Sequence, residues 1–312
     1  DLSASKYKIS IMQVQGKKFN KNERFLFNII DTLIKKKFTK KSVVISCGGG
    51  IVGDVSALAS SLYLRGLIYY HIPTTMTAIV DSCIGGKTGI NYKKIINSVG
   101  NYFHAKNVFI SKNIINFIPL REFRAGIPEI IKCGFINDYS ILQKLQNSKE
   151  IVMGRNFKFI SNLIYLTLKT KIKFFSKDVF EENERLKLNF GHTFAHALEM
   201  AMKFNKKEEI RHGEAVGIGM LCEIYYAEGK SKKFFLLEKI LKLYNLPTNL
   251  RFFKGFKYSK KFENKMFECI FLDKKRVGKH PRCIKIEKIG KSSILIMKDN
   301  HKIKQTIKNV VF

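Results

Sequence analysis

The sequence contains no tryptophan and only five prolines among its 312 residues. No Pro-rich or Ser/Gly-rich stretch marks a long linker, so we expect the domains of this chain to pack closely. No apolar run reaches the roughly eighteen residues that a membrane-spanning helix needs. The first eight residues also lack the apolar block of a secretory signal. These absences argue against a membrane or secreted protein and predict a cytoplasmic one.

Cysteine pairs are also missing. Six cysteines are scattered along the chain, and no two of them have CxxC spacing. The sequence therefore predicts neither a disulfide framework nor a thiolate zinc site. Any metal would have to be held by His, Asp or Glu side chains, and the chain has only seven histidines.

Acidic residues are scarce, since 25 Asp and Glu stand against 57 Lys and Arg and the net charge is +32. Such a charge suggests nucleic acid or an anionic membrane as a partner. However, 47 of the basic residues are Lys and only ten are Arg, and they are spread along the whole chain. Nucleic-acid-binding faces usually cluster Arg with aromatic residues. We therefore interpret the charge as a solvated surface and expect no specific nucleic acid and no membrane partner, although an anionic substrate would benefit from the field.

The first part of the chain alternates between helical and strand patterns. Apolar residues recur at helical spacing over 22–37, and β-branched runs at 42–47, 67–72 and 107–110 are typical of buried strands. The first of these runs ends in three glycines. This alternation predicts a parallel, Rossmann-like α/β domain over residues 1–118.

From residue 119 onward the pattern changes to long amphipathic stretches, with one short strand pair at 283–297. The stretches cover 120–134, 157–176, 189–202, 212–228 and 232–244. They predict a mostly α-helical second domain over residues 119–312. We expect the active site in the cleft between the two domains.

A glycine-rich turn, Gly48-Gly-Gly-Ile-Val-Gly53-Asp54, follows the first strand and begins a helix. Backbone N–H groups of such a turn can approach a pyrophosphate without obstruction by Cβ atoms, and the helix dipole favours the anion. The same pattern also fits a tight connection with no ligand. Phosphate binding and a plain turn are equally compatible with this motif alone.

Two further motifs follow the second strand: Pro73-Thr74-Thr75, and then the segment from Asp81 to Gly89 with Lys87 among its glycines. Ligands bind at the carboxyl ends of strands in α/β domains, and the Lys ammonium can meet a phosphate there. The alternative is a surface turn that happens to contain one of many lysines. The flexible Gly85-Gly86 pair favours a binding role over packing.

Three of the seven histidines fall between residues 192 and 212. His192 and His196 share one helical face at i, i+4, and Glu129 and Glu214 are acidic candidates. Two imidazoles and one carboxylate form a common catalytic zinc set that leaves a position open for substrate. A histidine on an apolar helix is more often a core residue, but a group of three beside glycines and acidic residues favours a metal.

Taken together, these motifs resemble the 3-dehydroquinate synthase family. The matching blocks are GGGIVGD, the Arg65-Gly66 pair, PTT, VDSCIGGKTGIN, RAGIPEIIKCG, RLKLNFGHTFAHALE, HGEAVGIGM and DKK, in the order and approximate spacing of the family. The resemblance implies a dehydroquinate synthase-like fold. It also implies an NAD- and metal-dependent lyase, which eliminates phosphate from 3-deoxy-arabino-heptulosonate 7-phosphate and closes the ring of 3-dehydroquinate in the shikimate pathway.

The resemblance implies that Glu129, His192 and His212 are the metal ligands, with Zn²⁺ expected and Co²⁺ as a second option. It therefore replaces the i, i+4 histidine pair suggested by spacing. His196 matches a residue that reaches the substrate phosphate and its proton transfer. In this family the chain would be a homodimer in which Arg65 serves the neighbouring subunit.

The remaining site residues are also implied by the resemblance. Positions that bind the substrate carboxylate and hydroxyls are matched by Lys132, Lys171, Arg185 and Asn189. The phosphate-binding group is matched by Arg65, Lys87, Asn97, and Lys274 or Lys275. Positions that bind NAD are matched by Gly50, Ile51, Val52, Gly53, Asp54, Thr74, Thr75, Asp81 and Lys87.

The sequence departs from the family on the cofactor side. The first strand and helix of the usual cofactor domain have no counterpart here, and the acidic residue expected at the adenosine ribose is Lys17. Where the family has Gly-Lys-Asn, this chain has Ile95-Ile96-Asn97. We expect weakened NAD binding. Related sugar-phosphate cyclases, and a catalytically impaired relic or basic binding protein, remain the alternatives. The related polyol dehydrogenases lack the phosphate-binding Lys and Arg set.

Overall fold

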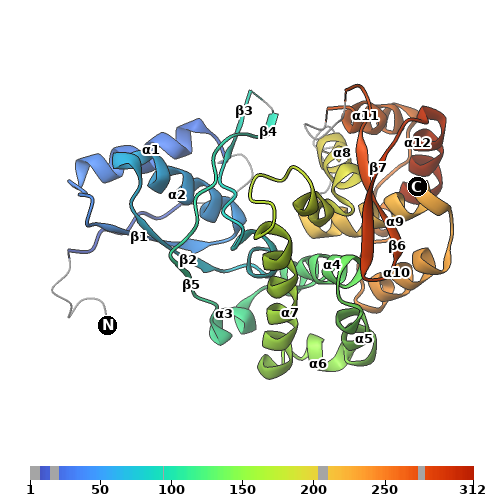
Figure 1. Cartoon of the computed structure of the whole chain (residues 1–312), viewed down its shortest axis with the longest axis horizontal. Helices are drawn as coiled ribbons and strands as arrows, with labels where there is room; N and C mark the ends of the chain where they lie inside the picture. The colour runs from blue at the N-terminus through green and yellow to red at the C-terminus, as the bar shows by residue number, and fades with distance from the viewer. Residues whose placement is uncertain (1–7, 15–20, 94, 203–209, 273–277) are drawn as a thin grey trace. The chain divides into compact units, whose positions relative to one another are not determined.

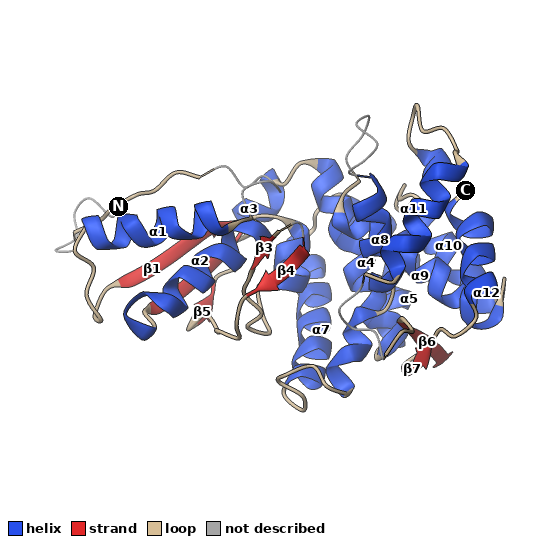
Figure 2. Ribbon diagram, turned by 90° about the horizontal axis from the view of Figure 1, so that it is seen from above, coloured by secondary structure: helices blue, strands red, loops and turns tan. Residues whose placement is uncertain are grey.

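The computed structural model describes residues 8–14, 21–93, 95–202, 210–272 and 278–312 (Figures 1 and 2). It divides into two compact units, residues 1–114 and residues 115–312, which are called unit 1 and unit 2 below. The predicted domain boundary after residue 118 stays a prediction. In the described part of the chain, no helix combines the length and the apolar character that crossing a membrane requires.

Unit 1 contains a three-stranded parallel sheet in the order β1-β2-β5, where β1 is Val43–Gly48, β2 is Ile68–Pro73 and β5 is Asn107–Val108. Helix α1 (Glu23–Lys35) begins where the side chain of Asn22 accepts the N–H of Phe25. Its apolar stripe packs with helix α2 (Gly50–Leu62) in one buried cluster. This arrangement confirms the predicted parallel α/β fold.

Unit 1 also contains an antiparallel hairpin, β3 (Ile90–Tyr92) and β4 (Ile95–Val99), that the sequence did not predict. The strands are short, and their connection carries Lys93 where a hairpin turn usually has Asn-Gly or Asp-Gly. Two short helical turns, Tyr63–Arg65 and Ala78–Ser82, complete the described elements of this unit.

Unit 2 is mostly helical, as predicted (Figures 1 and 2). Its helices are α4 (Leu120–Ile136), α5 (Tyr139–Asn147), α6 (Lys149–Met153), α7 (Phe157–Phe175), α8 (His192–Met202), α9 (His212–Glu228), α10 (Lys232–Leu243), α11 (Lys260–Ile270) and α12 (Asn300–Thr306). The hairpin pairs β6 (Arg282–Lys288) with β7 (Lys291–Ile296). Helix α3 (Lys112–Phe117) spans the junction between the units.

Helix α9 forms the centre of unit 2. Nearly all of its residues are buried, and it contacts α4, α8, α10, α12 and β6. A helix that is apolar on every side is expected to be surrounded by other elements. Its first residue is His212, so the buried helix fixes one end of the predicted metal site.

Candidate metal centre

Three helices of unit 2 bring three possible metal ligands together. Glu129 comes from the middle of α4 and is completely buried, while His192 and His212 are the first residues of α8 and α9. One ligand atom from each side chain lies within 4.8 Å of the other two. Among the residues that the structure describes, this is the one group of its kind.

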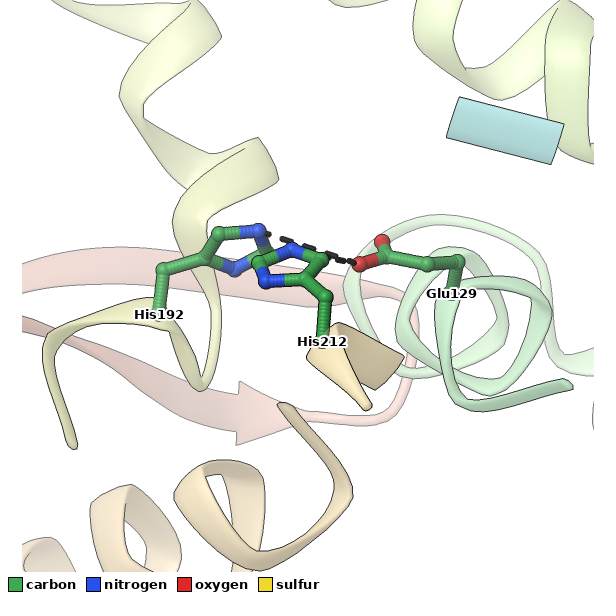
Figure 3. Close-up of side chains that lie close together, drawn as sticks. All are labelled: Glu129, His192 and His212. Carbon is green, nitrogen blue, oxygen red and sulfur yellow. Dashed lines mark ion pairs between the residues drawn. The ribbon is translucent and has the colours of Figure 1, made fainter. Parts of the chain in front are cut away.

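Both imidazoles face the same carboxylate oxygen (Figure 3). Nε2 of His192 lies 3.8 Å from Oε1 of Glu129, and Nε2 of His212 lies 3.6 Å from the same atom. Two imidazole nitrogens and one carboxylate oxygen are a donor set that catalytic zinc sites use, with a further position left for substrate. The geometry can therefore hold one divalent cation.

Each histidine is oriented through its other ring nitrogen. Nδ1 of His192 lies 3.3 Å from the carbonyl oxygen of Phe190, and Nδ1 of His212 lies 3.1 Å from a carboxylate oxygen of Glu199. Acceptors at Nδ1 place the ring proton there and leave the Nε2 lone pair for a metal. No motif in the sequence singled out Glu199. The one local indication of its role is that it lies three residues after His196, on the same helix.

The Glu129 carboxylate is buried and has few partners that could balance its charge. Its two oxygens are buried, and neither accepts a well-aligned hydrogen bond within the described part of the chain. The buried ammonium of Lys132, one turn along α4, forms an ion pair with Oε2. An anionic group buried with so few partners is costly unless it is paired with charge. The arrangement therefore fits a site that receives a metal.

A close helix contact sets the distance between Glu129 and His212. A Cβ atom on Gly213 would lie 1.6 Å from the carbonyl oxygen of Ala125, so only glycine allows α9 to approach α4 this closely. Two ion pairs hold the same helix ends together. Arg121 of α4 donates two hydrogen bonds to Glu214, at 2.8 and 3.0 Å, and Arg211 pairs with Glu122 at 2.5 Å.

A second glycine positions His192. Gly191 has a φ of +87°, and a Cβ there would lie 2.8 Å from the carbonyl oxygen of Val216 on α9. The sequence predicted one helix over 189–202, but the structure has a 3-10 helix over Glu184–Asn189, the turn at Gly191, and then α8 from His192. The break occurs because the left-handed conformation at Gly191 cannot continue a helix.

His196 lies beside the three ligands without joining their group. Its ring centroid is 5.5 Å from that of His192 and 6.1 Å from that of His212. The group of converging ligand atoms contains Glu129 and not His196. The i, i+4 histidine pair suggested by spacing is therefore not the ligand set that the described side chains form.

The other predicted substrate residues of unit 2 are mostly buried. Lys132, Lys171 and Arg185 are 1%, 6% and 4% exposed. Arg185 donates to the carbonyl oxygen of Val179 at 2.7 Å, and its guanidinium lies 5.7 Å from the centre of the Phe175 ring. Buried cations that are held this firmly are typical of anion-binding sites. Lys274 and Lys275 lie outside the described residues.

The loop before Arg185 is held by Asp178. The carboxylate accepts backbone N–H groups from Glu182, Asn183 and Arg185 at 2.8 to 3.0 Å. These hydrogen bonds lower the pKa of Asp178 although desolvation acts in the opposite direction. In the same loop Glu181, at a φ of +62°, accepts the Asn189 side chain at 2.7 Å. No motif in the sequence singled out Glu181. The one local indication is that it is an acidic residue four positions before Arg185.

In unit 1 the structure joins three predicted cofactor segments. The N–H of Thr74 donates to the carbonyl oxygen of Gly48 at 2.9 Å. Cβ atoms on Gly49 and Gly50 would lie 3.0 Å from side-chain atoms of Thr75 and Ser82. The glycine turn, the Thr pair and the helical turn that contains Asp81 therefore pack closely at the end of β1.

The remaining predicted residues of unit 1 differ in exposure. Arg65 and Lys87 are exposed, and Arg65 has a φ of +59°. Asn97 is also exposed and has a φ of +49°. Ile51, Val52 and Gly53 form the first turn of α2 together with Gly50, and Asp54 follows them. Lys17 lies outside the described residues.

Comparison with known sequences gives matches over most of the chain. A family model described as 3-dehydroquinate synthase N-terminal matches residues 11–125, and one described as 3-dehydroquinate synthase C-terminal matches residues 126–276. The 3-dehydroquinate synthase of Prochlorococcus marinus (strain MIT 9312) is 37% identical over 257 residues, which are 80% of this chain and 70% of the relative. That of Streptococcus pyogenes serotype M18 (strain MGAS8232) is 32% identical over 287 residues, 91% of this chain and 77% of the relative.

Solved structures share the fold at lower identity. A 2-epi-5-epi-valiolone synthase from Streptomyces hygroscopicus subsp. jinggangensis 5008, solved with NAD⁺ and Zn²⁺, matches with a TM-score of 0.82 at 22% identity, covering 95% of this chain and 81% of that one. A 2-deoxy-scyllo-inosose synthase, complexed with carbaglucose-6-phosphate, NAD⁺ and Co²⁺, matches with a TM-score of 0.82 at 21% identity, covering 97% and 83%. These likenesses confirm the predicted fold class.

Proposed function

The chain belongs to the 3-dehydroquinate synthase family, and we propose that it carries out that reaction with a metal held by Glu129, His192 and His212. The substrate is 3-deoxy-arabino-heptulosonate 7-phosphate, and the products are 3-dehydroquinate and phosphate. The observation that carries the proposal is the convergence of two imidazoles on one buried carboxylate oxygen. Two imidazole nitrogens and one carboxylate oxygen within 4.8 Å of one another match the donor set of a catalytic metal site.

Two groups would supply chemistry that side chains lack. NAD accepts and returns a hydride, and a divalent metal acts as a Lewis acid. The metal residues fit Zn²⁺ or Co²⁺ because their donors are imidazole nitrogen and carboxylate oxygen. The glycine turn fits a dinucleotide because it ends at the N-terminus of α2, where backbone N–H groups and the helix dipole favour a phosphate.

The cationic side chains of unit 2 would bind the substrate's acidic end. Lys132, Lys171 and Arg185 are buried, and Asn189 is tied to Glu181, so their positions are set before substrate arrives. His196 stands beside the metal ligands and would move a proton at the substrate phosphate. In unit 1, Arg65, Lys87 and Asn97 would bind the phosphate and stabilise it as a leaving group. Lys274 and Lys275 keep this role as a prediction from sequence.

The exposed Arg65 also supports a proposal about assembly. Its guanidinium is not buried within its own chain, and its backbone holds a left-handed conformation beside Gly66. We propose a homodimer in which Arg65 reaches the site of the partner subunit. Sedimentation of the protein measures whether it is a dimer. Mixing inactive Arg65→Ala chains with inactive His212→Ala chains then tests whether Arg65 serves the partner's site. Activity that returns on mixing supports the proposal, and its failure to return contradicts it.

The assay for the function uses the whole chain with zinc and NAD. Phosphate release from 3-deoxy-arabino-heptulosonate 7-phosphate, together with formation of the ring product, is the expected result. Glucose 6-phosphate is the matched alternative substrate, because a related cyclase was solved with a glucose 6-phosphate analogue. Turnover of glucose 6-phosphate alone would favour the sugar-phosphate cyclases. Turnover of neither substrate, in a protein that holds zinc, would favour a catalytically impaired relic.

A further inference from the structure

Lys21 joins two parts of unit 1 that are distant in the sequence. Its ammonium donates to a carboxylate oxygen of Asp54 at 2.5 Å and to the side-chain oxygen of Asn97 at 2.6 Å. Its carbonyl oxygen accepts the N–H of Asn91 on β3 at 2.9 Å. The Lys21 side chain is only 12% exposed. It therefore holds the helix after the glycine turn to the β3–β4 hairpin.

The residue before Asn97 is Ile96, which cannot provide a positive charge beside it. Ile96 stands where the resembling family has a lysine, and its apolar side chain offers neither a charge nor a hydrogen-bond donor. The structure brings a lysine to Asn97 from a separate segment of the chain. No motif in the sequence singles out Lys21, since the family position matched in this stretch is Lys17.

We propose that Lys21 is a phosphate-contacting residue of this site: it supplies beside Asn97 the positive charge that Ile96 cannot. The inference rests on the proposed function, which assigns Asp54 to the NAD site and Asn97 to phosphate binding. Lys21 is not among the site residues that the motifs of the sequence implied.

The hydrogen bonds determine how the amide is turned. The Asn97 side-chain oxygen accepts from the Lys21 ammonium, and this hydrogen bond holds the Asn97 amide in place. The backbone N–H of Asn97 donates to the side-chain oxygen of Asn91 at 2.9 Å, which fixes the residue further.

The charge of Lys21 acts in two ways. An ammonium has three N–H donors, and within the described residues Asp54 and Asn97 accept two of them, which leaves one for an anion. Burial raises the pKa of Asp54, whereas Lys21 opposes that rise and holds the carboxylate in an ion pair. Without Lys21, an Asp54 carboxylate would repel a phosphate group close to it.

Two ligands could provide the phosphate oxygen: the diphosphate of NAD or the phosphomonoester of the substrate. The experiment separates them with Lys21→Met, which removes the charge and shortens the unbranched side chain by one atom. NAD binding is measured by calorimetry, and the phosphomonoester is followed through the substrate KM and through inhibition by inorganic phosphate. Loss of one charge-assisted hydrogen bond predicts binding about ten- to a hundredfold weaker for the ligand that Lys21 contacts.

Matched variants test charge and folding separately. Lys41→Met removes an exposed charge from the same unit and should change neither ligand's affinity. Lys21→Arg should retain most binding, and Ile96→Lys in the Lys21→Met protein should restore part of it. If Lys21→Met unfolds because Asp54 loses its partner, the Lys21→Met/Asp54→Asn protein is compared with Asp54→Asn alone, since Asp54 is itself assigned to the NAD site. Zinc content should stay at the wild-type value, since the metal residues belong to unit 2.

The outcomes separate this inference from the proposed function. Weaker NAD binding assigns Lys21 to the diphosphate, a raised KM and weaker inhibition by phosphate assign it to the monoester, and both changes support a contact with each. Unchanged values for all ligands in an active, folded Lys21→Met protein would overturn the inference and leave the proposed function standing. A wild-type protein that releases no phosphate would overturn the proposed function, while the binding of NAD and inorganic phosphate would still test Lys21.

Discussion

The carboxylate of Glu199 lies 3.1 Å from Nδ1 of His212, and Nε2 of the same ring lies 3.6 Å from Glu129. Glu199 therefore acts on the metal site through His212, without being one of the converging ligands. Such a partner fixes the orientation and tautomer of the imidazole and makes it a better electron donor. The zinc affinity of the site should therefore depend on the charge of Glu199.

Glu199→Gln should weaken zinc binding by about ten- to a hundredfold, because a neutral amide oxygen is a poorer acceptor than a carboxylate. The measurement is competition with a chelator of known zinc affinity. Glu238→Gln is the matched control, since Glu238 pairs with Lys242 on the surface of α10 and lies in the same unit. Equal zinc affinities in the wild type and the Glu199→Gln protein would show that His212 does not depend on Glu199.

Gly213→Ala should damage the metal site although it changes no ligand. The new Cβ would fall 1.6 Å from the Ala125 carbonyl oxygen, so α9 must move away from α4 and take His212 away from Glu129. Overpacking of this kind typically costs about 1 to 3 kcal/mol of unfolding free energy. We expect both a lower melting temperature and weaker zinc binding.

Gly217→Ala provides the control in the same helix. Its Cβ would lie 3.1 Å from the end of the Leu241 side chain, which can move, and alanine favours a helix by roughly 1 kcal/mol over glycine. That protein should keep its zinc affinity and most of its stability. If both substitutions lowered zinc affinity equally, the close contact at Ala125 would not be what positions His212.

His212→Ala and His196→Ala should have opposite effects on the metal. The first removes a converging ligand atom, so zinc and activity should both be lost, whereas the second should keep stoichiometric zinc and slow phosphate elimination. Metal analysis of the two purified variants is the measurement. Zinc that stays in the His212→Ala protein, or leaves the His196→Ala protein, would contradict the assignment of the three ligands.

Glycine turns and apolar periodicity are local signals, and they were enough to predict the fold class. Histidine spacing alone suggested the pair His192 and His196, whereas the three side chains that converge in the structure were those implied by the family resemblance. Glu199 and Lys21 could not be found in this way. Each acts through a partner that is fixed only in three dimensions: His212 lies thirteen residues after Glu199, and Asn97 lies 76 residues after Lys21. The sequence carries no signal for a long-range contact between single polar residues.

The break before His192 shows another limit. Apolar periodicity over 189–202 indicated one continuous helix. Periodicity carries no information about backbone angles, so it could not show that Gly191 adopts a φ of +87°. The cause is the approach of α9, where Gly219 and Gly191 meet so closely that a Cβ on Gly219 would lie 2.0 Å from the Gly191 carbonyl oxygen. Tertiary packing determined this boundary, and local helix propensity did not.

His71 provides a prediction about pH in unit 1. The ring is buried beside Gly53 of the glycine turn, and Nδ1 lies 2.7 Å from the Ser46 hydroxyl, which in turn lies 2.6 Å from the hydroxyl of Tyr69. Tyr69 donates to the Gly53 carbonyl oxygen at 3.1 Å. Burial lowers the pKa of His71 below its usual 6.5, so the folded protein keeps the ring neutral.

The sign of the effect follows from proton counting. Above pH 6.5 the ring is neutral in both the folded and the unfolded chain, and its contribution to stability is fully present. As the pH falls below 6.5, the unfolded chain binds a proton that the folded chain excludes until the lowered pKa is reached, so the free energy of unfolding decreases. The slope from this one group is at most about 1.4 kcal/mol per pH unit.

His71→Gln isolates this contribution, because glutamine cannot titrate and can still form a hydrogen bond with Ser46. We expect the variant to be less stable than the wild type at neutral pH, and the difference to shrink as the pH decreases through 6.5. Denaturant unfolding of both metal-free proteins between about pH 5 and 8 is the measurement, since the other histidines then titrate equally in each. A difference that stays constant over this range would show that His71 takes up protons equally in the folded and unfolded chains.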